Sequence, residues 1–209
     1  VPQYEQNQMM TAQMTLEFYK AGTEIYDLGC STGKTAKVLN RIFGDKQFSY
    51  TGIDNSETMI DECVKIQPLF SAPHDVKFVL GNVEEYPYHN ASVMIANYTF
   101  QFIPKDKRLG LLKNILKATV PGGIILLCEK VYENDKKLSE QFVKMHHRMK
   151  KDYGYSELEI IQKRDAIENV LVPNETGENL ELLYQAGFAS AAIYHKWYNF
   201  ASYIAVKGA

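Results

Sequence analysis

Five short runs of apolar and β-branched residues, separated by helical patterns, constrain the fold more than any other feature of this sequence. The strand-like runs cover residues 24–28, 48–53, 76–80, 91–96 and 124–128. Helical patterns cover residues 5–20, 34–43, 57–67 and 107–118, and Pro121-Gly122-Gly123 stops the last of them. In the first helix, the apolar spacing comes from Met9, Met10, Met14 and residues 16–18. This alternation predicts an α/β fold with a doubly wound, mostly parallel sheet, whose ligands bind at the carboxyl ends of the strands.

The pattern changes after residue 128. Helices are predicted over residues 136–152, 156–170 and 178–185, and Ser156 with Glu159 forms a capping-box signature at the start of the second. Two strand-like runs, 191–197 and 200–206, are separated only by Tyr198 and Asn199, which predicts a C-terminal antiparallel hairpin. We therefore expect a single domain over residues 1–209, with a helical insertion at about 134–172.

The composition is that of an ordinary folded chain. Hydrophobic residues make up 45% and charged residues 23%, which excludes global disorder. The net charge of −2 gives no electrostatic footprint for direct nucleic-acid binding or for a membrane surface. No stretch approaches the roughly 18 apolar residues that would span a bilayer. The chain begins Val-Pro-Gln-Tyr without Met, so we expect the native product to have further residues before it.

Cysteine and histidine positions point away from disulfide and metal chemistry. Cys30, Cys63 and Cys128 are odd in number and widely spaced, which argues against a disulfide framework or a zinc site and favours a cytoplasmic location. His146 and His147 are adjacent in a predicted helix, so their rings point to different faces and are not expected to share a metal ion. No metal site is predicted.

Polar or glycine residues follow four consecutive strands. Gly29-Cys30-Ser31 follows the first strand, Asp54 the second, Gly81-Asn82 the third and Asn97 the fourth. Each position also has a simple structural explanation: a strand-to-helix turn, a helix N-cap, a turn residue or a strand-end cap. Gly29 and Gly33 supply only part of the dinucleotide fingerprint G-x-G-x-x-G, which weakens the case for a pyrophosphate ligand. Taken together at one sheet edge, these positions favour a nucleoside such as S-adenosylmethionine over a nicotinamide cofactor.

Several sequence segments carry a family resemblance. The generic one is Tyr26-Asp27-Leu28-Gly29-Cys30-Ser31, and the discriminating ones are Gly154-Tyr155-Ser156-Glu157-Leu158-Glu159-Ile160 and Gln162-Lys163-Arg164. Further matching segments are residues 1–4, 52–56, 97–102, 129–130, 168–170 and 199–200. With these segments the chain resembles the class I S-adenosylmethionine-dependent methyltransferases and, more narrowly, the carboxy-S-adenosyl-L-methionine synthase family, over essentially its whole length.

The resemblance implies a set of site residues. Those expected to contact the cofactor, S-adenosylmethionine or its carboxylated form, are Tyr4, Gly29, Cys30, Ser31, Asp54, Asn55, Asn82, Val83 and Asn97. The family often has Asp where this chain has Asn82. Arg164 matches the arginine that binds the transferred carboxylate, and in the family it comes from the neighbouring subunit, which implies a homodimer. From the residues alone, a helical ion pair with Glu168 is the favoured explanation of Arg164, and only the resemblance favours the carboxylate-binding role.

The implied reaction converts S-adenosylmethionine and prephenate to carboxy-S-adenosylmethionine, phenylpyruvate and water, for the 5-oxyacetic acid modification of wobble uridine in tRNA. Two alternatives remain: an ordinary small-molecule methyltransferase on the same fold, and a non-catalytic S-adenosylmethionine-binding domain. Direct RNA modification is disfavoured by the charge balance. The aromatic side chains of Tyr98, Phe100 and Phe102 could line the mouth of the substrate site or pack in the core, and core packing is the default expectation.

Overall fold

A mixed sheet runs through the middle of the molecule, and the computed structural model describes residues 3–70, 72–156 and 170–209. The strand order is β3-β2-β1-β4-β5-β8-β7. The strands are β1 (Glu24–Leu28), β2 (Ser49–Asp54), β3 (Asp75–Leu80), β4 (Ala91–Asn97), β5 (Thr119–Tyr132), β7 (Ser190–Trp197) and β8 (Phe200–Val206). The two-residue β6 (Asn174–Glu175) pairs with β5 beside this path. Strands β1 to β5 are parallel, whereas β8 is antiparallel to both β5 and β7, so the predicted fold class and hairpin are confirmed.

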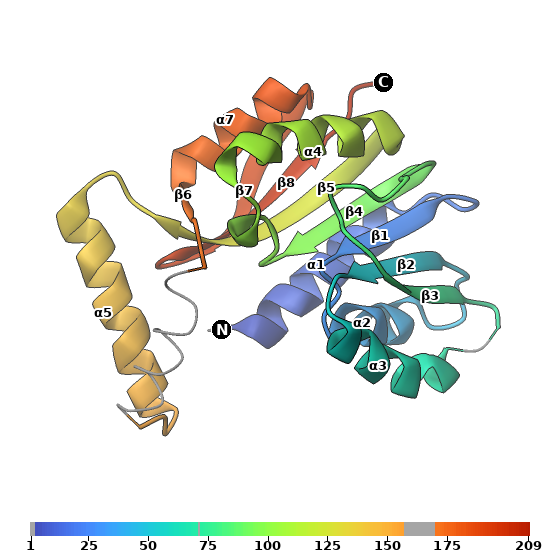
Figure 1. Ribbon diagram of the computed structural model, residues 1–209, viewed down its shortest axis with the longest axis horizontal. Coiled ribbons are helices and arrows are strands. Elements are labelled where there is room, and N and C mark those ends of the chain that lie inside the picture. The colour runs from blue at the N-terminus through green and yellow to red at the C-terminus, as the bar shows by residue number, and fades with distance from the viewer. Residues whose placement is uncertain (1–2, 71, 157–169) are drawn as a thin grey trace.

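Helices cover both faces of the sheet (Figure 1). They are α1 (Tyr4–Phe18), α2 (Lys34–Phe43), α3 (Glu57–Ile66), α4 (Lys105–Ala118), α5 (Lys136–Asp152) and α7 (Thr176–Ala186), with short 3₁₀ turns η1 (Gln67–Leu69) and η2 (Phe100–Phe102). Helices α1 and α2 pack together on one face, and α4 packs with α7 on the other. No helix in these described ranges is long and apolar enough to cross a membrane.

Strand β4 shows why the centre of the sheet is apolar on both sides. Val93 and Ile95 belong to the core beneath α1 and α2, whereas Met94 and Ala96 belong to the core beneath α4 and α7. All four side chains are fully buried. A strand covered on both faces needs a continuous apolar run, because successive side chains point to opposite faces. The polar residues that follow such strands are therefore confined to the sheet edge.

The glycine-rich segment after α4 differs from its prediction. The helix does end at Ala118, but Pro121-Gly122-Gly123 lies within β5, which begins at Thr119. The pairing between β4 and β5 jumps from Thr119 to Ile124, so the segment forms a bulge in a long strand. A Cβ on Gly123 would lie 2.6 Å from a methyl group of Thr119, which explains the glycine. Local turn residues could not distinguish a bulge from a loop.

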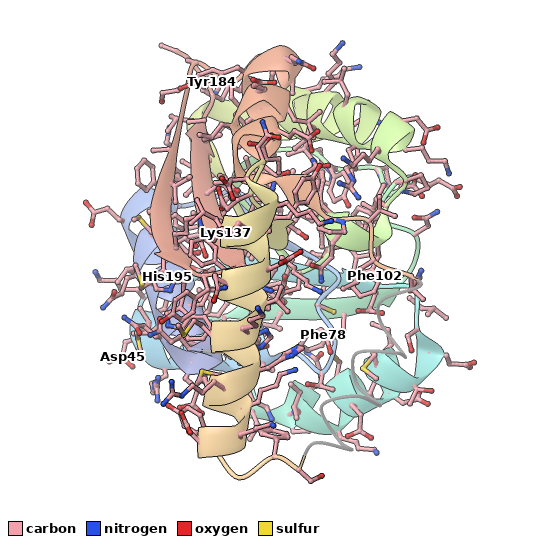
Figure 2. The ribbon with its side chains drawn as sticks, turned by 90° about the vertical axis from the view of Figure 1, so that its left-hand side faces the viewer. Asp45, Phe78, Phe102, Lys137, Tyr184 and His195 are labelled. Atoms are coloured by element: carbon pink, nitrogen blue, oxygen red, sulfur yellow. The ribbon has the colours of Figure 1, made fainter. Side chains whose placement is uncertain are left out.

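Helix α5 stands away from the sheet at the hairpin end of the molecule (Figures 1 and 2). Figure 2 looks onto this side and shows α5 running down it from the end marked by Lys137. The His146 ring packs edge-on against Trp197 and Phe200, with centroids 6.1 and 5.1 Å away. The predicted helix over 136–152 is confirmed with these bounds, whereas most of the predicted helix over 156–170 lies outside the described residues.

Candidate functional site

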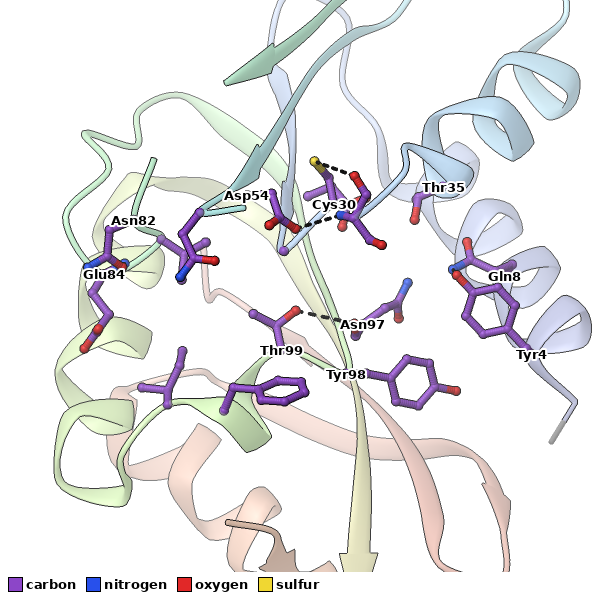
Figure 3. Close-up of a pocket in the computed structure, with 17 residues that line it drawn as sticks. Tyr4, Gln8, Cys30, Thr35, Asp54, Asn82, Glu84, Asn97, Tyr98 and Thr99 are labelled. Atoms are coloured by element: carbon purple, nitrogen blue, oxygen red, sulfur yellow. Dashed lines mark hydrogen bonds between the residues drawn. The ribbon is translucent and has the colours of Figure 1, made fainter. Parts of the chain in front are cut away.

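A pocket of about 540 Å³ opens at the carboxyl ends of β1, β2, β3 and β4, and the start of α1 closes one end of it (Figure 3). All nine residues predicted to contact a cofactor line this pocket: Tyr4, Gly29, Cys30, Ser31, Asp54, Asn55, Asn82, Val83 and Asn97. The lining also includes Gln8, Asp27, Thr35, Glu84, Tyr98, Thr99, Phe102 and Ile103. Arg164 lies outside the described residues. The structure thus brings together residues that the sequence separates by more than ninety positions.

The turn after β1 brings its backbone close to the pocket. Gly29 has a φ of +73°, and a Cβ there would lie 2.5 Å from Thr99 Oγ1. The Thr99 hydroxyl in turn donates a hydrogen bond to the carbonyl of Leu28 at 2.6 Å. Ser31 also has a positive φ, of 50°. Because only glycine fits at position 29, the backbone of this turn can approach a ligand closely.

Asp54 ties the turn after β1 to the end of β2. Its Oδ2 accepts a hydrogen bond from the Ser31 N–H at 2.8 Å, and its Oδ1 accepts one from the Ser56 N–H at 3.0 Å. Each carboxylate oxygen has two acceptor sites, so each keeps one for a ligand. Asp54 is not the N-cap of α3, which is Ser56, but it binds the backbone of that residue and also faces the pocket.

Asn82 and its neighbours form the end of the pocket that lies away from α1. The Asn82 Oδ1 accepts a hydrogen bond from the Glu84 N–H at 3.0 Å, as in a turn stabilised by its own side chain. Val83, Phe102 and Ile103 give this end an apolar wall. An apolar wall beside an amide edge suits a flat aromatic base.

Tyr4 is held at the other end of the pocket by three contacts. Its ring stacks on Tyr98 with centroids 6.2 Å apart, and the Lys34 ammonium lies 4.5 Å from its centroid. Gln8 Nε2 donates to the Tyr4 hydroxyl at 3.2 Å. These contacts fix the first turn of α1 over the pocket.

Two of the three aromatic residues line the pocket, which is the alternative to the default expectation of core packing. Tyr98 and Phe102 belong to the lining, and Phe102 is 52% exposed. Phe100 between them is buried in the core and fulfils the packing expectation. Phe100 and Phe102 belong to the short turn η2, whose tight backbone sends their side chains in different directions, and Tyr98 precedes this turn with a φ of 62°.

Two buried carboxyl groups lie in or behind the pocket. Asp27 accepts a hydrogen bond from the Tyr50 hydroxyl at 2.7 Å, and burial raises its pKa to about 6. Glu129 accepts hydrogen bonds from the N–H groups of Thr99, Phe100 and Gln101 at 3.2, 2.9 and 2.9 Å. Burial raises the pKa of Glu129 to about 8, although these donors act in the opposite direction. Glu129 therefore anchors the turn that carries Thr99 and Phe102 into the pocket.

Cys30 is not a nucleophile in this arrangement. Its side chain is buried and hydrogen-bonded with that of Cys63, and both effects raise the pKa of Cys30 far above its usual range. The Cys63 thiol also donates to the Ser31 carbonyl at 3.0 Å. A thiol held in this way stays protonated, so the contribution of Cys30 to the site is shape and backbone geometry.

Gln8 and Thr35 are lining residues that sequence reasoning missed. Neither follows a strand, which was the signal used to find the others, since Gln8 lies in α1 and Thr35 in α2. A usable signal was the polarity of the first helix, whose buried residues include Asn7, Gln8 and Thr11.

Comparisons with known proteins find a methyltransferase domain and fold, together with curated relatives of one name. The family model described as "Methyltransferase domain" matches residues 25–123. The chain is 42% identical over 207 residues to the carboxy-S-adenosyl-L-methionine synthase of Desulforapulum autotrophicum, covering 99% of this chain and 84% of that one. The corresponding synthase of Desulfotalea psychrophila is 38% identical with the same coverage. Among solved structures, an S-adenosylmethionine-dependent methyltransferase from Methanosarcina mazei has a TM-score of 0.63 at 17% identity, covering 93% of this chain and 97% of that one.

Proposed function

Because the chain belongs to the carboxy-S-adenosyl-L-methionine synthase family, we propose that it makes carboxy-S-adenosylmethionine from S-adenosylmethionine and prephenate. Phenylpyruvate and water are the other products, and the carboxylated compound serves the 5-oxyacetic acid modification of wobble uridine in tRNA. The observation that carries the proposal is the pocket itself. Nine residues from four strand ends and the start of α1 surround it, and they are the nine positions at which the family resemblance implies a cofactor contact.

The pocket supports a nucleoside ligand along its length. The free acceptor sites of Asp54 suit the two ribose hydroxyls, because a carboxylate accepts from both. The adenine base fits between Val83, Phe102 and Ile103, with the Asn82 amide at its edge. The Gly29 turn then lies beneath the methionine portion, where a side chain would block the approach.

The charge of the pocket supports a cationic ligand. Asp27 and Asp54 are among its lining residues, and no Lys or Arg is present in the lining that the structure describes. S-adenosylmethionine supplies a positively charged sulfonium whose methyl group is the site of carboxylation. Carboxylates near this charge stabilise the bound ligand, and the effect is stronger where water is excluded.

The residues of the chain must hold two reactants in line, exclude water and neutralise a carboxylate. We assign the last task to Arg164, since a guanidinium is always charged and grips a carboxylate with two parallel hydrogen bonds. Support comes from the segment Gln162-Lys163-Arg164, which is among the segments that carry the family resemblance.

We also propose that the enzyme is a homodimer in which Arg164 serves the partner's pocket. The α5 helix supports this proposal with exposed apolar side chains: Leu138 is 50%, Val143 37% and Met145 41% exposed. A cytoplasmic location is proposed on the basis of the three cysteines, all of which are free thiols.

One incubation tests the activity. The purified chain is mixed with S-adenosylmethionine and prephenate, and the products are analysed by mass spectrometry, with a reaction lacking prephenate as the control. A gain of one carboxyl group on S-adenosylmethionine, together with phenylpyruvate, is the expected result. Formation of S-adenosylhomocysteine with a methylated product would instead indicate an ordinary methyltransferase, and binding without turnover would indicate a non-catalytic domain.

The role of Arg164 has its own test. The Arg164→Ala variant is expected to bind S-adenosylmethionine normally but to lose the preference for the carboxylated form, because only the latter carries the extra carboxylate. Calorimetric titration with both ligands measures this difference. Equal weakening of both ligands would contradict the assignment.

A further inference from the structure

Helix α1 buries a polar face, which is unusual for a helix packed on a sheet. The residues on this face that are at most 2% exposed are Asn7, Gln8, Thr11, Ala12 and Thr15. Burying a polar group destabilises a protein unless the group forms hydrogen bonds. The hydrogen-bond partners of these side chains therefore indicate which of them serve the fold and which serve something else.

The threonines of this face and one oxygen of Asn7 have partners within the protein. The Asn7 Oδ1 accepts a hydrogen bond from the Ser202 hydroxyl at 2.7 Å. The Thr11 hydroxyl lies 3.3 Å from that of Tyr194, and the Thr15 hydroxyl donates to the Thr11 carbonyl at 2.8 Å. These bonds attach α1 to the C-terminal hairpin and to itself, so they serve the fold.

Gln8 differs, because only one of the two polar atoms of its side-chain amide has a hydrogen-bond partner. Its Nε2 donates to the Tyr4 hydroxyl, but its Oε1 is buried and accepts nothing from the residues that the structure describes. A buried acceptor without a donor destabilises the folded protein. Gln8 is also a lining residue of the pocket, beside Tyr4 and facing the end where Asn97 lies (Figure 3). The missing donor is therefore expected from a ligand.

Asn97, on the other side of this end of the pocket, also lacks hydrogen-bond partners for its side-chain amide. Both its Nδ2 and its Oδ1 are buried, and neither has a partner in the described part of the chain. Two amides with free carbonyl oxygens thus converge on a site whose described lining contains acidic residues and no basic residue. The Lys34 ammonium near this end lies against the ring of Tyr4. Carbonyl oxygens near carboxylates suit a positively charged N–H donor, since amide oxygens accept hydrogen bonds and a cation is attracted to the acids.

We propose that Gln8 is a binding residue for the α-ammonium group of the ligand, with its Oε1 accepting a hydrogen bond from that ammonium. This inference rests on the proposed function, which supplies S-adenosylmethionine as the ligand. The Tyr4 hydroxyl holds the amide in place, and the ring of Tyr4 is itself fixed between Tyr98 and Lys34. The first two turns of α1, which carry Tyr4 and Gln8, are then part of the ligand site as well as its cover.

The test compares three ligands on the Gln8→Met variant, which keeps the length of the side chain and removes the acceptor. S-adenosylmethionine carries both the ammonium and the carboxylate, decarboxylated S-adenosylmethionine keeps only the ammonium, and methylthioadenosine has neither. We expect calorimetry to show about tenfold weaker binding of the first two, the equivalent of one lost hydrogen bond to a charged group, and unchanged binding of methylthioadenosine.

Gln13→Met is the matched control, because Gln13 is exposed on the same helix, and its affinities should equal those of the wild type. Weakening of S-adenosylmethionine alone would assign Gln8 to the carboxylate and overturn the proposal. Equal weakening of all three ligands would overturn it in favour of a structural role. Gln8→Leu provides the same comparison if the methionine variant does not fold. Failure of the wild type to bind S-adenosylmethionine would refute the proposed function itself.

Discussion

At the scale of single residues, the site depends on a close contact between two turns. Gly29 and Thr99 follow different strands, and the threonine hydroxyl bonds the carbonyl just before the glycine. The sequence indicated that Gly29 begins a turn, but the contact with Thr99 could not be predicted, because it depends on how β1 and β4 pair. The sequence thus predicted a turn at Gly29, and the packing of Thr99 against it explains why the residue must be glycine.

Gly29→Ala is expected to destabilise the protein and to weaken binding of S-adenosylmethionine at least tenfold. The new Cβ would lie 2.5 Å from Thr99 Oγ1, and the positive φ is unfavourable for alanine. Gly110→Ala is the matched control, since Gly110 lies in α4 with no atom within 4 Å of the added Cβ. That substitution should leave binding unchanged and stabilise the protein by about 0.5–1 kcal/mol. Urea unfolding and calorimetry measure both effects, and a Gly29→Ala variant with wild-type affinity would contradict the account.

At the scale of elements, strands and their order of appearance were predictable, and the roles of helices were less so. The strand predicted over 91–96 is present and extends by one residue to Asn97. It was predictable because a strand buried on both faces has a continuous apolar run. For α1 the sequence indicated a helix from the apolar spacing of Met9, Met10 and Met14, whereas the most buried residues of this helix are mostly polar. Helical spacing cannot reveal a polar face that is stabilised by hydrogen bonds to distant strands.

The element-scale prediction concerns Glu129, which connects β5 to η2. Its pKa is about 8 in the folded protein, against a usual value of 4.5, because burial disfavours the charged form. At a pH between these two pKa values, Glu129 holds a proton in the folded protein that it has released in the unfolded chain. The contribution of Glu129 to the unfolding free energy is therefore fully present below about pH 4.5 and declines as the pH rises toward 8.

We expect the unfolding free energy of the wild type, relative to Glu129→Gln, to decrease between pH 5.5 and 8.5. Each pKa unit corresponds to about 1.4 kcal/mol, so the decrease should be readily measured by urea unfolding. Taking the difference at each pH removes the contributions of Asp27 and His146, whose pKa values are also shifted by burial. Glu140→Gln, on the exposed surface of α5, is the control and should show no such trend. A flat difference curve for Glu129→Gln would contradict the raised pKa.

At the scale of the whole molecule, the pocket exists because parallel strands end at one edge of the sheet. This edge could be predicted from the sequence, since it follows from the alternation of strands and helices. What could not be predicted is the completion of the site by other parts of the molecule: α1 covers one end through contacts with the C-terminal hairpin, as Asn7 and Ser202 show. Such contacts join residues near opposite ends of the chain and leave no local pattern.

The proposed dimer has a consequence that single variants cannot test. Asp54→Ala should disable the pocket of its own subunit, and Arg164→Ala should disable the pocket of its partner, so each variant alone is expected to be inactive. In a mixed dimer, one pocket would combine Asp54 of one chain with Arg164 of the other and remain intact. Random reassociation of equal amounts makes half of the dimers mixed, each with one working pocket, so about a quarter of wild-type activity should return. Carboxylation assays after co-refolding measure this recovery, with each variant refolded alone as the control. If Arg164 instead served its own subunit, every pocket in the mixture would lack one of the two residues, and activity would stay at the level of the single variants.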